Sequence, residues 1–211
     1  MATNFSRVLS NTVRPDWTLK VVQPKAEAAA SDPALAELDE GQLVAACLAG
    51  RREAFDLIVE RHRRSVYLLC YRFVGNHEDA SDLSQDVFVR AYKGLQRFRG
   101  QSSLGTWIYR IGVNVCLNRV SAKRPATEPI DARPHLDQHA VDPAAELLKG
   151  ERASQVREAI SQLPRKQRAT VILRVYHELS HEEIAGILGS SVGAVKANFF
   201  HALANLKRLL K

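Results

Sequence analysis

SHEEIAGILGSSVGAVKANFFH, residues 180–201, has the pattern of two short helices joined by a tight turn. Ser180 followed three residues later by Glu183 forms a capping box, in which each side chain accepts a hydrogen bond from a backbone N–H at a helix start. Apolar residues then recur at helical spacing until Gly189, which can adopt the left-handed conformation that ends a helix. Either of the two serines that follow can cap the second helix. This spacing is typical of a helix-turn-helix, whose second helix enters the major groove of DNA.

The second of these helices has one apolar side and one side that can contact DNA. The apolar side is formed by Val192, Val195 and Phe199. On the other side, Lys196, Asn198 and His201 offer groups that can pair with base edges in the major groove. An ordinary helical hairpin buried in a core is the alternative for this stretch, and the rest of the chain has to decide between the two.

The composition is that of a globular chain with a preference for polyanionic partners. The 211 residues suffice for one large domain or two small ones, and 30 basic against 23 acidic residues leave a net charge of +7. Cys47, Cys70 and Cys116 have no CxxC spacing, which indicates buried thiols in a reducing compartment. No apolar run predicts a membrane span, and the N-terminus lacks the core of a signal peptide. We expect a cytoplasmic protein, with a transit peptide as the weaker alternative.

Helical patterns dominate the front half, and its charge changes sign partway along. Helices are predicted from about Asp39, over 52–74, over 77–95 and over 104–120. The helix over 77–95 opens with four acids: Glu78, Asp79, Asp82 and Asp86. These acids suit the helix dipole, and they also form an acidic face that a basic partner could bind. From Val87 to Pro125 there are eight basic residues and no acidic one.

Within this basic stretch, aromatic and amide side chains alternate with the arginines. Such a surface can bind single-stranded nucleic acid, because charges follow the phosphates while rings stack on unpaired bases, at about 1–3 kcal/mol per base. Trp107 belongs to the apolar stripe of its helix, so a core position is favoured over a wedge between bases. A solvated basic face with no ligand is the alternative.

Four prolines and an excess of acids mark residues 122–150 as a linker, although helical pattern resumes near Pro143. We therefore predict an all-α fold of two small helical domains joined by a flexible linker. The predicted segments are a mobile arm over 1–37, a front domain over 38–121, a linker over 122–146 and a back domain over 147–211.

His177-Glu178-Leu179-Ser180-His181 matches the HExxH signature of zinc hydrolases. That chemistry requires both histidines on one face of a continuous helix. The capping box at Ser180 instead predicts a helix boundary between the two histidines, so we reject a zinc site. No metal or cofactor is expected, because phosphate-binding and dinucleotide-binding loops and nucleophile elbows are also missing from the sequence.

Two sets of motifs resemble the bacterial RNA polymerase sigma factors of the extracytoplasmic-function (ECF, group IV) branch of the sigma-70 family. The front set is DASDLSQDVF over 79–88, FRGQSS over 98–103 and TWIYRIGVN over 106–114. The back set is LP over 163–164, LSHEEIA over 179–185 and SVGAVK over 191–196. Members of this branch keep only two conserved regions, so the resemblance implies a region 2 bundle followed by a region 4 helix-turn-helix.

The resemblance implies a transcription initiation factor rather than an enzyme. Such a protein binds the β and β′ subunits of core RNA polymerase, directs the enzyme to specific promoters and helps to melt the DNA. Relatives often act in a stress or envelope response and are held by an anti-sigma factor, so we expect one here. Membrane insertion is not expected.

The resemblance also assigns roles to individual residues of this chain. Core polymerase would bind Asp82, Leu83, Gln85, Asp86 and Phe88. The proximal promoter element would bind Arg97, Phe98, Arg99, Ser102, Ser103, Arg110, Asn114 and Asn118. The distal element would bind Ser191, Lys196, Ala197, Asn198, Phe200 and His201. Many relatives carry several arginines in the last of these helices, whereas this chain has Lys196 alone, which predicts a weaker phosphate grip or a different base preference.

Two other functions remain open from the residues alone. One is a helix-turn-helix regulator that does not bind core polymerase, which would not need the acidic face before the basic stretch. The other is a helical adaptor whose basic faces contact membranes or proteins. A steep loss of DNA binding with salt would separate DNA recognition from the adaptor.

Overall fold

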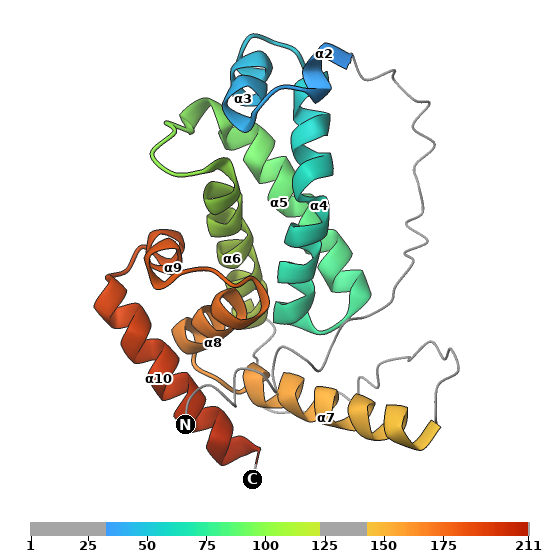
Figure 1. The fold of residues 1–211 in the computed structure, drawn as a ribbon, viewed down its shortest axis with the longest axis vertical. Coiled ribbons are helices and arrows are strands. Elements are labelled where there is room, and N and C mark those ends of the chain that lie inside the picture. The colour runs from blue at the N-terminus through green and yellow to red at the C-terminus, as the bar shows by residue number, and fades with distance from the viewer. Residues whose placement is uncertain (1–32, 123–142, 211) are drawn as a thin grey trace.

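The structure, a computed structural model, describes residues 33–122 and 143–210, and all of its regular elements within those ranges are helical (Figure 1). This confirms the predicted all-α fold. The first range forms the front module: α2 (Pro33–Ala36), α3 (Glu40–Leu48), α4 (Glu53–Val74), α5 (His77–Gly94), the 3-10 turn η1 (Leu95–Arg97) and α6 (Leu104–Ala122). The second range forms the back module: α7 (Pro143–Ser161), α8 (Arg165–Val171), the π-helical turn η2 (Ile172–Tyr176), α9 (His181–Leu188) and α10 (Val192–Leu209).

In the front module α4, α5 and α6 pack side by side, with α3 across the start of α4. The apolar stripe of α4 supplies the centre of this bundle, and its fully buried members include Ile58, Val66, Leu69 and Phe73. Gly112 of α6 allows α4 to approach closely, because a Cβ there would lie only 2.8 Å from a methyl group of Leu69. The bundle is therefore specified by one broad apolar face and one small residue opposite it.

The helix ends of the front module are fixed by local signals in the sequence. Asp39 and Gln42 form a capping box, with Asp39 Oδ1 accepting from the Gln42 N–H at 2.8 Å and Gln42 Oε1 accepting from the Asp39 N–H at 2.9 Å. Gly75 ends α4 in the left-handed conformation at φ 79°, and Asn76 caps α5 by accepting from the Asp79 N–H. These caps satisfy backbone groups that a helix end otherwise leaves unpaired.

The back module packs α8, α9 and α10 around a small core that includes Ile172, Leu173, Ile184 and Leu206. The predicted capping box of Ser180 and Glu183 is present at the start of α9. Gly189 ends that helix at φ 57°, and the second serine, Ser191, caps α10. The π-helical turn η2 was not predicted, because the sequence there has the pattern of a regular α-helix. In the structure η2 replaces the end of that helix.

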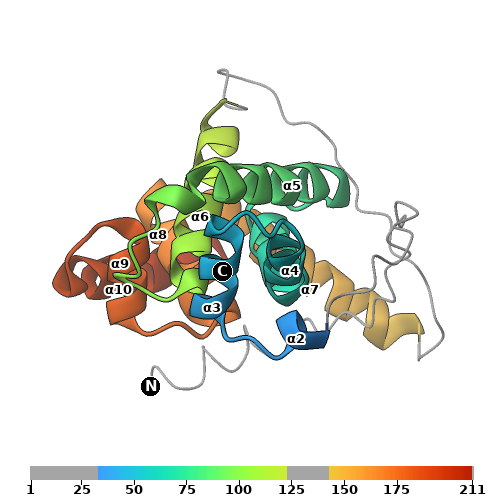
Figure 2. The ribbon, with the colours of Figure 1, turned by 90° about the horizontal axis from the view of Figure 1, so that it is seen from above.

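The two modules pack against each other, which the sequence did not predict. Figures 1 and 2 both place α8 and α9 beside α6, and α9 contacts α6 while η2 contacts α4. Buried apolar residues of both modules form one continuous cluster. Residues 1–32 and 123–142, on which most of the predicted arm and most of the predicted linker fall, lie outside the described part. The last residues assigned to the arm, from Pro33, include α2, whose Leu35 is buried. The last residues assigned to the linker, from Pro143, begin α7.

No helix in the part of the chain that the structure describes is both long and apolar enough to cross a bilayer.

Candidate polymerase and nucleic-acid interfaces

The outer side of α5 carries acidic and apolar side chains together. Asp82 and Gln85 are exposed, and Asp86 is half-buried. Val89 and Tyr92 are 50% and 48% exposed, although both are large and apolar. Residues three and four apart on a helix are neighbours, so these five side chains form one stripe, which we name the α5 face. Adjoining exposed apolar side chains beside acids are typical of a protein-binding surface.

Two of the residues predicted to bind polymerase lie off this face. Leu83 is only 9% exposed and belongs to the core, and Phe88 is partly buried against the same core. Their positions stabilise α5 and leave little apolar surface for a partner. Val89 and Tyr92 were not predicted from the sequence, although their spacing of seven from Asp82 and from Gln85 places them on the acidic stripe.

Asp86 and Arg90 join the α5 face to a neighbouring basic surface. Arg90 Nε lies 2.9 Å from Asp86 Oδ1, and both side chains are more than a third exposed. The hydrogen bond to Asp86 raises the pKa of the Arg90 guanidinium. Exposed pairs of this spacing contribute only about 0.3–0.5 kcal/mol, so the two side chains can exchange this contact for others.

An open groove of about 390 Å³ runs between α5, η1 and α6. It is lined by Arg90, Gly94, Arg97, Trp107, Ile111, Asn114, Val115 and Asn118. Three of the residues predicted to bind the proximal promoter element therefore meet there: Arg97, Asn114 and Asn118. Arg90 was not predicted from the sequence, because nothing in its local pattern places it beside residues of α6. Guanidinium, amide and indole groups in one groove can bind phosphates and unpaired bases.

Trp107 forms one wall of this groove and is partly buried. A Cβ added at Gly94 would lie 3.3 Å from its ring, so α5 approaches the indole closely. The Phe98 ring packs against it at 5.3 Å between centroids. The prediction that Trp107 contributes to the core is confirmed, and the same ring also contributes to the groove surface.

The loop between η1 and α6 is anchored at both ends by residues that were predicted to bind DNA. Phe98 holds its first end on Trp107, and Ser103 holds its second end, because Ser103 Oγ accepts from the Thr106 N–H at 3.1 Å. Ser102 Oγ donates to the Ser103 carbonyl oxygen at 3.3 Å. Arg99 is exposed on this anchored loop, and Arg97 is exposed just before it, at the end of η1.

Arg110, also predicted to bind the proximal element, lies away from the groove. It is exposed, but its Nη2 donates to the carbonyl oxygen of Gly186 in α9 at 2.5 Å. The hydroxyl of its neighbour Tyr109 hydrogen-bonds Nδ1 of His177 at 3.0 Å. Burial raises the pKa of Tyr109. The structure therefore separates Arg110 from the other predicted DNA contacts and joins it to the back module.

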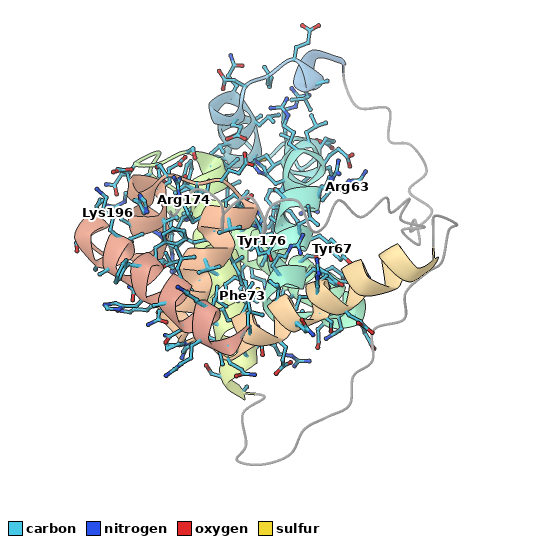
Figure 3. The ribbon with its side chains drawn as sticks, turned by 60° about the horizontal axis from the view of Figure 1, so that its bottom comes forward. Arg63, Tyr67, Phe73, Arg174, Tyr176 and Lys196 are labelled. Atoms are coloured by element: carbon cyan, nitrogen blue, oxygen red, sulfur yellow. The ribbon has the colours of Figure 1, made fainter. Side chains whose placement is uncertain are left out.

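Most of the predicted distal-element residues share the outer side of α10. Ala197, Phe200 and His201 are exposed there, with Phe200 at 70%. Lys196 is also exposed and lies at the outer edge of the back module, away from α4 (Figure 3).

The other two residues predicted to bind the distal element are less available to DNA. Asn198 is half-buried. Ser191 Oγ caps α10 by accepting a hydrogen bond from the Ala194 N–H at 3.2 Å.

The HExxH histidines do not share a helix, as predicted. His177 follows η2, whereas His181 is the first residue of α9. His177 is instead enclosed between the modules, where burial lowers its pKa to about 4, with the cation Arg72 adding to the shift. Among the residues that the structure describes, no three candidate metal ligands cluster.

Comparison with known proteins assigns the chain to a family. Residues 58–125 match the family model Sigma-70 region 2, and residues 153–206 match Sigma-70, region 4. The RNA polymerase sigma-H factor of Pseudomonas aeruginosa is 33% identical over 84% of this chain and 96% of its own. The chain belongs to the extracytoplasmic-function sigma factors of the sigma-70 family. The ECF RNA polymerase sigma factor SigW of Bacillus subtilis is 31% identical over 77% of this sigma factor and 91% of its own chain.

Among solved structures, this sigma factor is similar to CnrH in a complex with the cytosolic domain of CnrY. The identity is 27%, the match covers 85% of this chain and 97% of the other, and the TM-score is 0.59. The region 2 match contains the α5 face and the groove, and the region 4 match contains α9 and most of α10. The protein is thus a transcription initiation factor and not an enzyme.

Proposed function

We propose that the α5 face docks this sigma factor on core RNA polymerase, at a basic helical surface formed by its β and β′ subunits. The support is the combination of two acids, an exposed amide and two exposed apolar side chains on one helix side. Acidic groups favour a basic partner and set its orientation, while Tyr92 is the type of residue that dominates binding energy at interfaces.

The groove and the anchored loop then bind the proximal promoter element and hold its strands apart. Arg90 and Arg97 contact backbone phosphates, and Asn114 and Asn118 hydrogen-bond exposed base edges. The rigid anchoring of the loop at Phe98 and Ser103 supports this role, because a preformed surface loses less entropy when it captures a base outside the duplex.

The helix α10 reads the distal element from the major groove. Its outer side offers Lys196 for a phosphate or a guanine, and Ala197 and Phe200 for apolar contact with thymine methyl groups. His201 adds a ring nitrogen within the same surface. Asn198 and Ser191 contribute less, since one is half-buried and the other is engaged in capping.

An anti-sigma factor regulates this protein in the proposed function, in response to an envelope or other stress. The solved structure of the similar protein CnrH, which holds it in a complex with the cytosolic domain of CnrY, supports this part of the proposal. The anti-sigma factor would cover the α5 face, because that surface places two of the three large apolar side chains that are exposed in the described front module, Val89 and Tyr92, beside its acids.

The main support for the proposal is that one module carries an acidic and apolar docking face next to a basic groove. An ion pair between Asp86 of the face and Arg90 of the groove joins the two surfaces. Run-off transcription with purified core polymerase over a randomised promoter library tests it. We expect stable holoenzyme and initiation at promoters that share two sequence elements. Failure to bind core polymerase, or initiation without sequence preference, would contradict the proposal.

A further inference from the structure

Two of the three cysteines meet in the core of the front module. Cys70 of α4 and Cys116 of α6 are both fully buried, and their thiol groups are joined by a hydrogen bond. The two residues are far apart in the sequence, so the packing of α6 on α4 brings them together (Figure 1). Cys47 of α3 is the third cysteine and is only half-buried. All three are free thiols, so the core holds a reduced dithiol that spans two helices.

The helices approach each other closely beside this pair. Leu69 precedes Cys70 on α4, and Gly112 lies one turn before Cys116 on α6. A Cβ at Gly112 would lie 2.8 Å from a methyl group of Leu69, so no larger residue could separate the two helices there. A disulfide requires Cα atoms within about 4–7 Å and sulfur atoms about 2 Å apart. Thiols already in contact across so narrow an interface need only a small movement of the sulfur atoms to reach that bond.

The surroundings of the pair make it slow to react with an oxidant. The hydrogen bond with Cys70 and then burial raise the pKa of the Cys116 thiol, and the nearby cation Arg168 lowers it by less. Since the thiolate is the reactive form, little of the pair is reactive at neutral pH. An oxidant also has to wait for the helices to open locally. The dithiol should therefore stay reduced under weak oxidation and respond only to a sustained or concentrated oxidant.

Contact between the sulfur atoms favours a disulfide once either thiol has reacted. One thiolate attacks an oxygen of hydrogen peroxide, the O–O bond breaks, and the sulfur becomes a sulfenic acid while hydroxide leaves and takes up the thiol's proton as water. The second thiol then displaces the hydroxyl group, which leaves with its proton as water, and an S–S bond forms. The two thiols lose two electrons and two protons, and peroxide is reduced to two waters. The second step needs no encounter, so it should outpace further oxidation to sulfinic acid.

We propose that Cys70 and Cys116 are an oxidation site of this sigma factor, at which peroxide closes a disulfide between α4 and α6. The bond stabilises the front module, because a cross-link restricts the unfolded chain and so lowers the entropy gained on unfolding. The same bond fixes α6, which carries the groove residues Asn114 and Asn118, to the longest helix of the bundle. The proposal is independent of which partners the groove and the α5 face bind.

The full-length Cys47→Ala protein is the test sample, because it leaves Cys70 and Cys116 as its only thiols. It is freed of reductant and kept in hydrogen peroxide for hours. Catalase then removes the peroxide, and the protein is unfolded in excess N-ethylmaleimide, which alkylates every remaining thiol. We expect most of the protein to carry no maleimide and to be lighter by about 2 Da, the mass of two hydrogen atoms. Tryptic digestion should yield a peptide pair that joins Cys70 to Cys116 and that dithiothreitol separates.

Thermal unfolding measures the effect of the bond on the fold. The midpoint of the oxidised Cys47→Ala protein should rise by about 5–15 °C over that of the untreated sample, and dithiothreitol should reverse the rise. Cys116→Ala is the matched control, because it keeps Cys70 but cannot form the bond. Circular dichroism checks its fold, and peroxide should not raise its midpoint. The peptide assignment in Cys47→Ala does not depend on whether this control folds.

Two results would overturn the oxidation site. In one, both thiols are still alkylated after treatment that converts Cys47 of the wild-type protein to its sulfinic or sulfonic acid. In the other, Cys70 and Cys116 become separate sulfinic or sulfonic acids, or they cross-link only in urea above the unfolding transition. Either outcome would show that the folded core does not hold the two sulfur atoms in a bonding position. A disulfide that leaves the midpoint unchanged or lowers it would overturn the stabilising role.

Discussion

The guanidinium of Arg168, at the start of α8, caps the last turn of α4 by donating from Nη2 to the carbonyl oxygen of Phe73. Its centre also lies 5.9 Å from the centroid of the Phe73 ring. The final carbonyl groups of a helix have no partner within it and carry partial negative charge. A cation from the back module therefore completes a helix of the front module, 95 residues earlier in the chain.

Replacing Arg168 by methionine should destabilise the protein. The variant leaves the Phe73 carbonyl buried without its charged donor, and hydrogen bonds to charged groups contribute about 1.5–3 kcal/mol. Urea unfolding followed by circular dichroism measures the loss. Arg165→Met is the matched control, since Arg165 is an exposed arginine on the same helix and should change the free energy of unfolding little. Equal stability of the two variants would contradict the capping role.

Removing the apolar part of the α5 face should weaken the complex with core polymerase. Tyr92→Ala takes away an aromatic anchor and should raise the dissociation constant about five- to thirtyfold, a loss of about 1–2 kcal/mol. Asp86→Arg should abolish association through charge reversal while the fold persists. Fluorescence anisotropy with labelled sigma factor and core enzyme measures both. Leu209→Ala, at an exposed apolar residue of α10, should bind normally. Normal binding by Tyr92→Ala would place the docking surface elsewhere.

Arg90 should contribute to DNA binding although no sequence motif marked it. Arg90→Gln removes a cation from the groove, and the slope of log affinity against log salt should fall by about 0.7 for a lost single-strand phosphate contact. Lys93→Gln is the control of equal charge change, because Lys93 is exposed on α5 but does not line the groove. The holoenzyme is titrated with the proximal-element strand over a salt series. Identical slopes for the two variants would remove Arg90 from the interface.

Distal-element recognition should depend more on Lys196 than on Asn198. Lys196 is exposed, whereas Asn198 is half-buried on the side of α10. Lys196→Ala should cost about 1–3 kcal/mol at promoters where it contacts a base, and Asn198→Ala clearly less. Transcription is compared on templates with an intact and a scrambled distal element, so that a loss confined to the intact template identifies the reader. A larger effect of Asn198→Ala would mean that α10 presents its other side to the major groove of the DNA.

Acid should loosen the contact between the two modules through His177. Its pKa is about 4 where the modules are packed together, against 6.5 for an unperturbed histidine, and Nε2 is buried with no hydrogen-bond partner among the described residues. The groups that face its ring are Tyr109 of α6, Arg72 of α4 and the adjoining Tyr176. Because packing of the modules lowers this pKa, the contribution of neutral His177 to packing is fully present above pH 6.5 and is lost as the pH falls toward 4.

The loss reaches about 1.4 kcal/mol for each pH unit within that window. Small-angle scattering of the free protein from pH 7.5 to 5 should show increasing dimensions. In His177→Gln, which cannot titrate, the dimensions should stay constant over the same range even where that variant is more open throughout. A parallel pH response in wild type and His177→Gln would assign the effect to another group.

The sequence by itself determined most of the helices and their ends, although α2 and the π-helical turn η2 were not predicted. Caps such as Ser180 with Glu183, and stops such as Gly75 and Gly189, act within one turn of the chain, so local pattern suffices to place them. Two motif sets in the correct order were also enough to indicate the family, because they consist of contiguous residues.

Only the tertiary structure decided which side chains remain available to a partner. Leu83 and Val89 belong to the same helix and are both apolar, yet α4 and α6 bury one and leave the other exposed. Arg110 and Tyr109 find partners 76 and 68 residues away, a pairing that no local pattern encodes. Exposure and long-range contact depend on how helices pack, and packing is set by the whole set of apolar faces together.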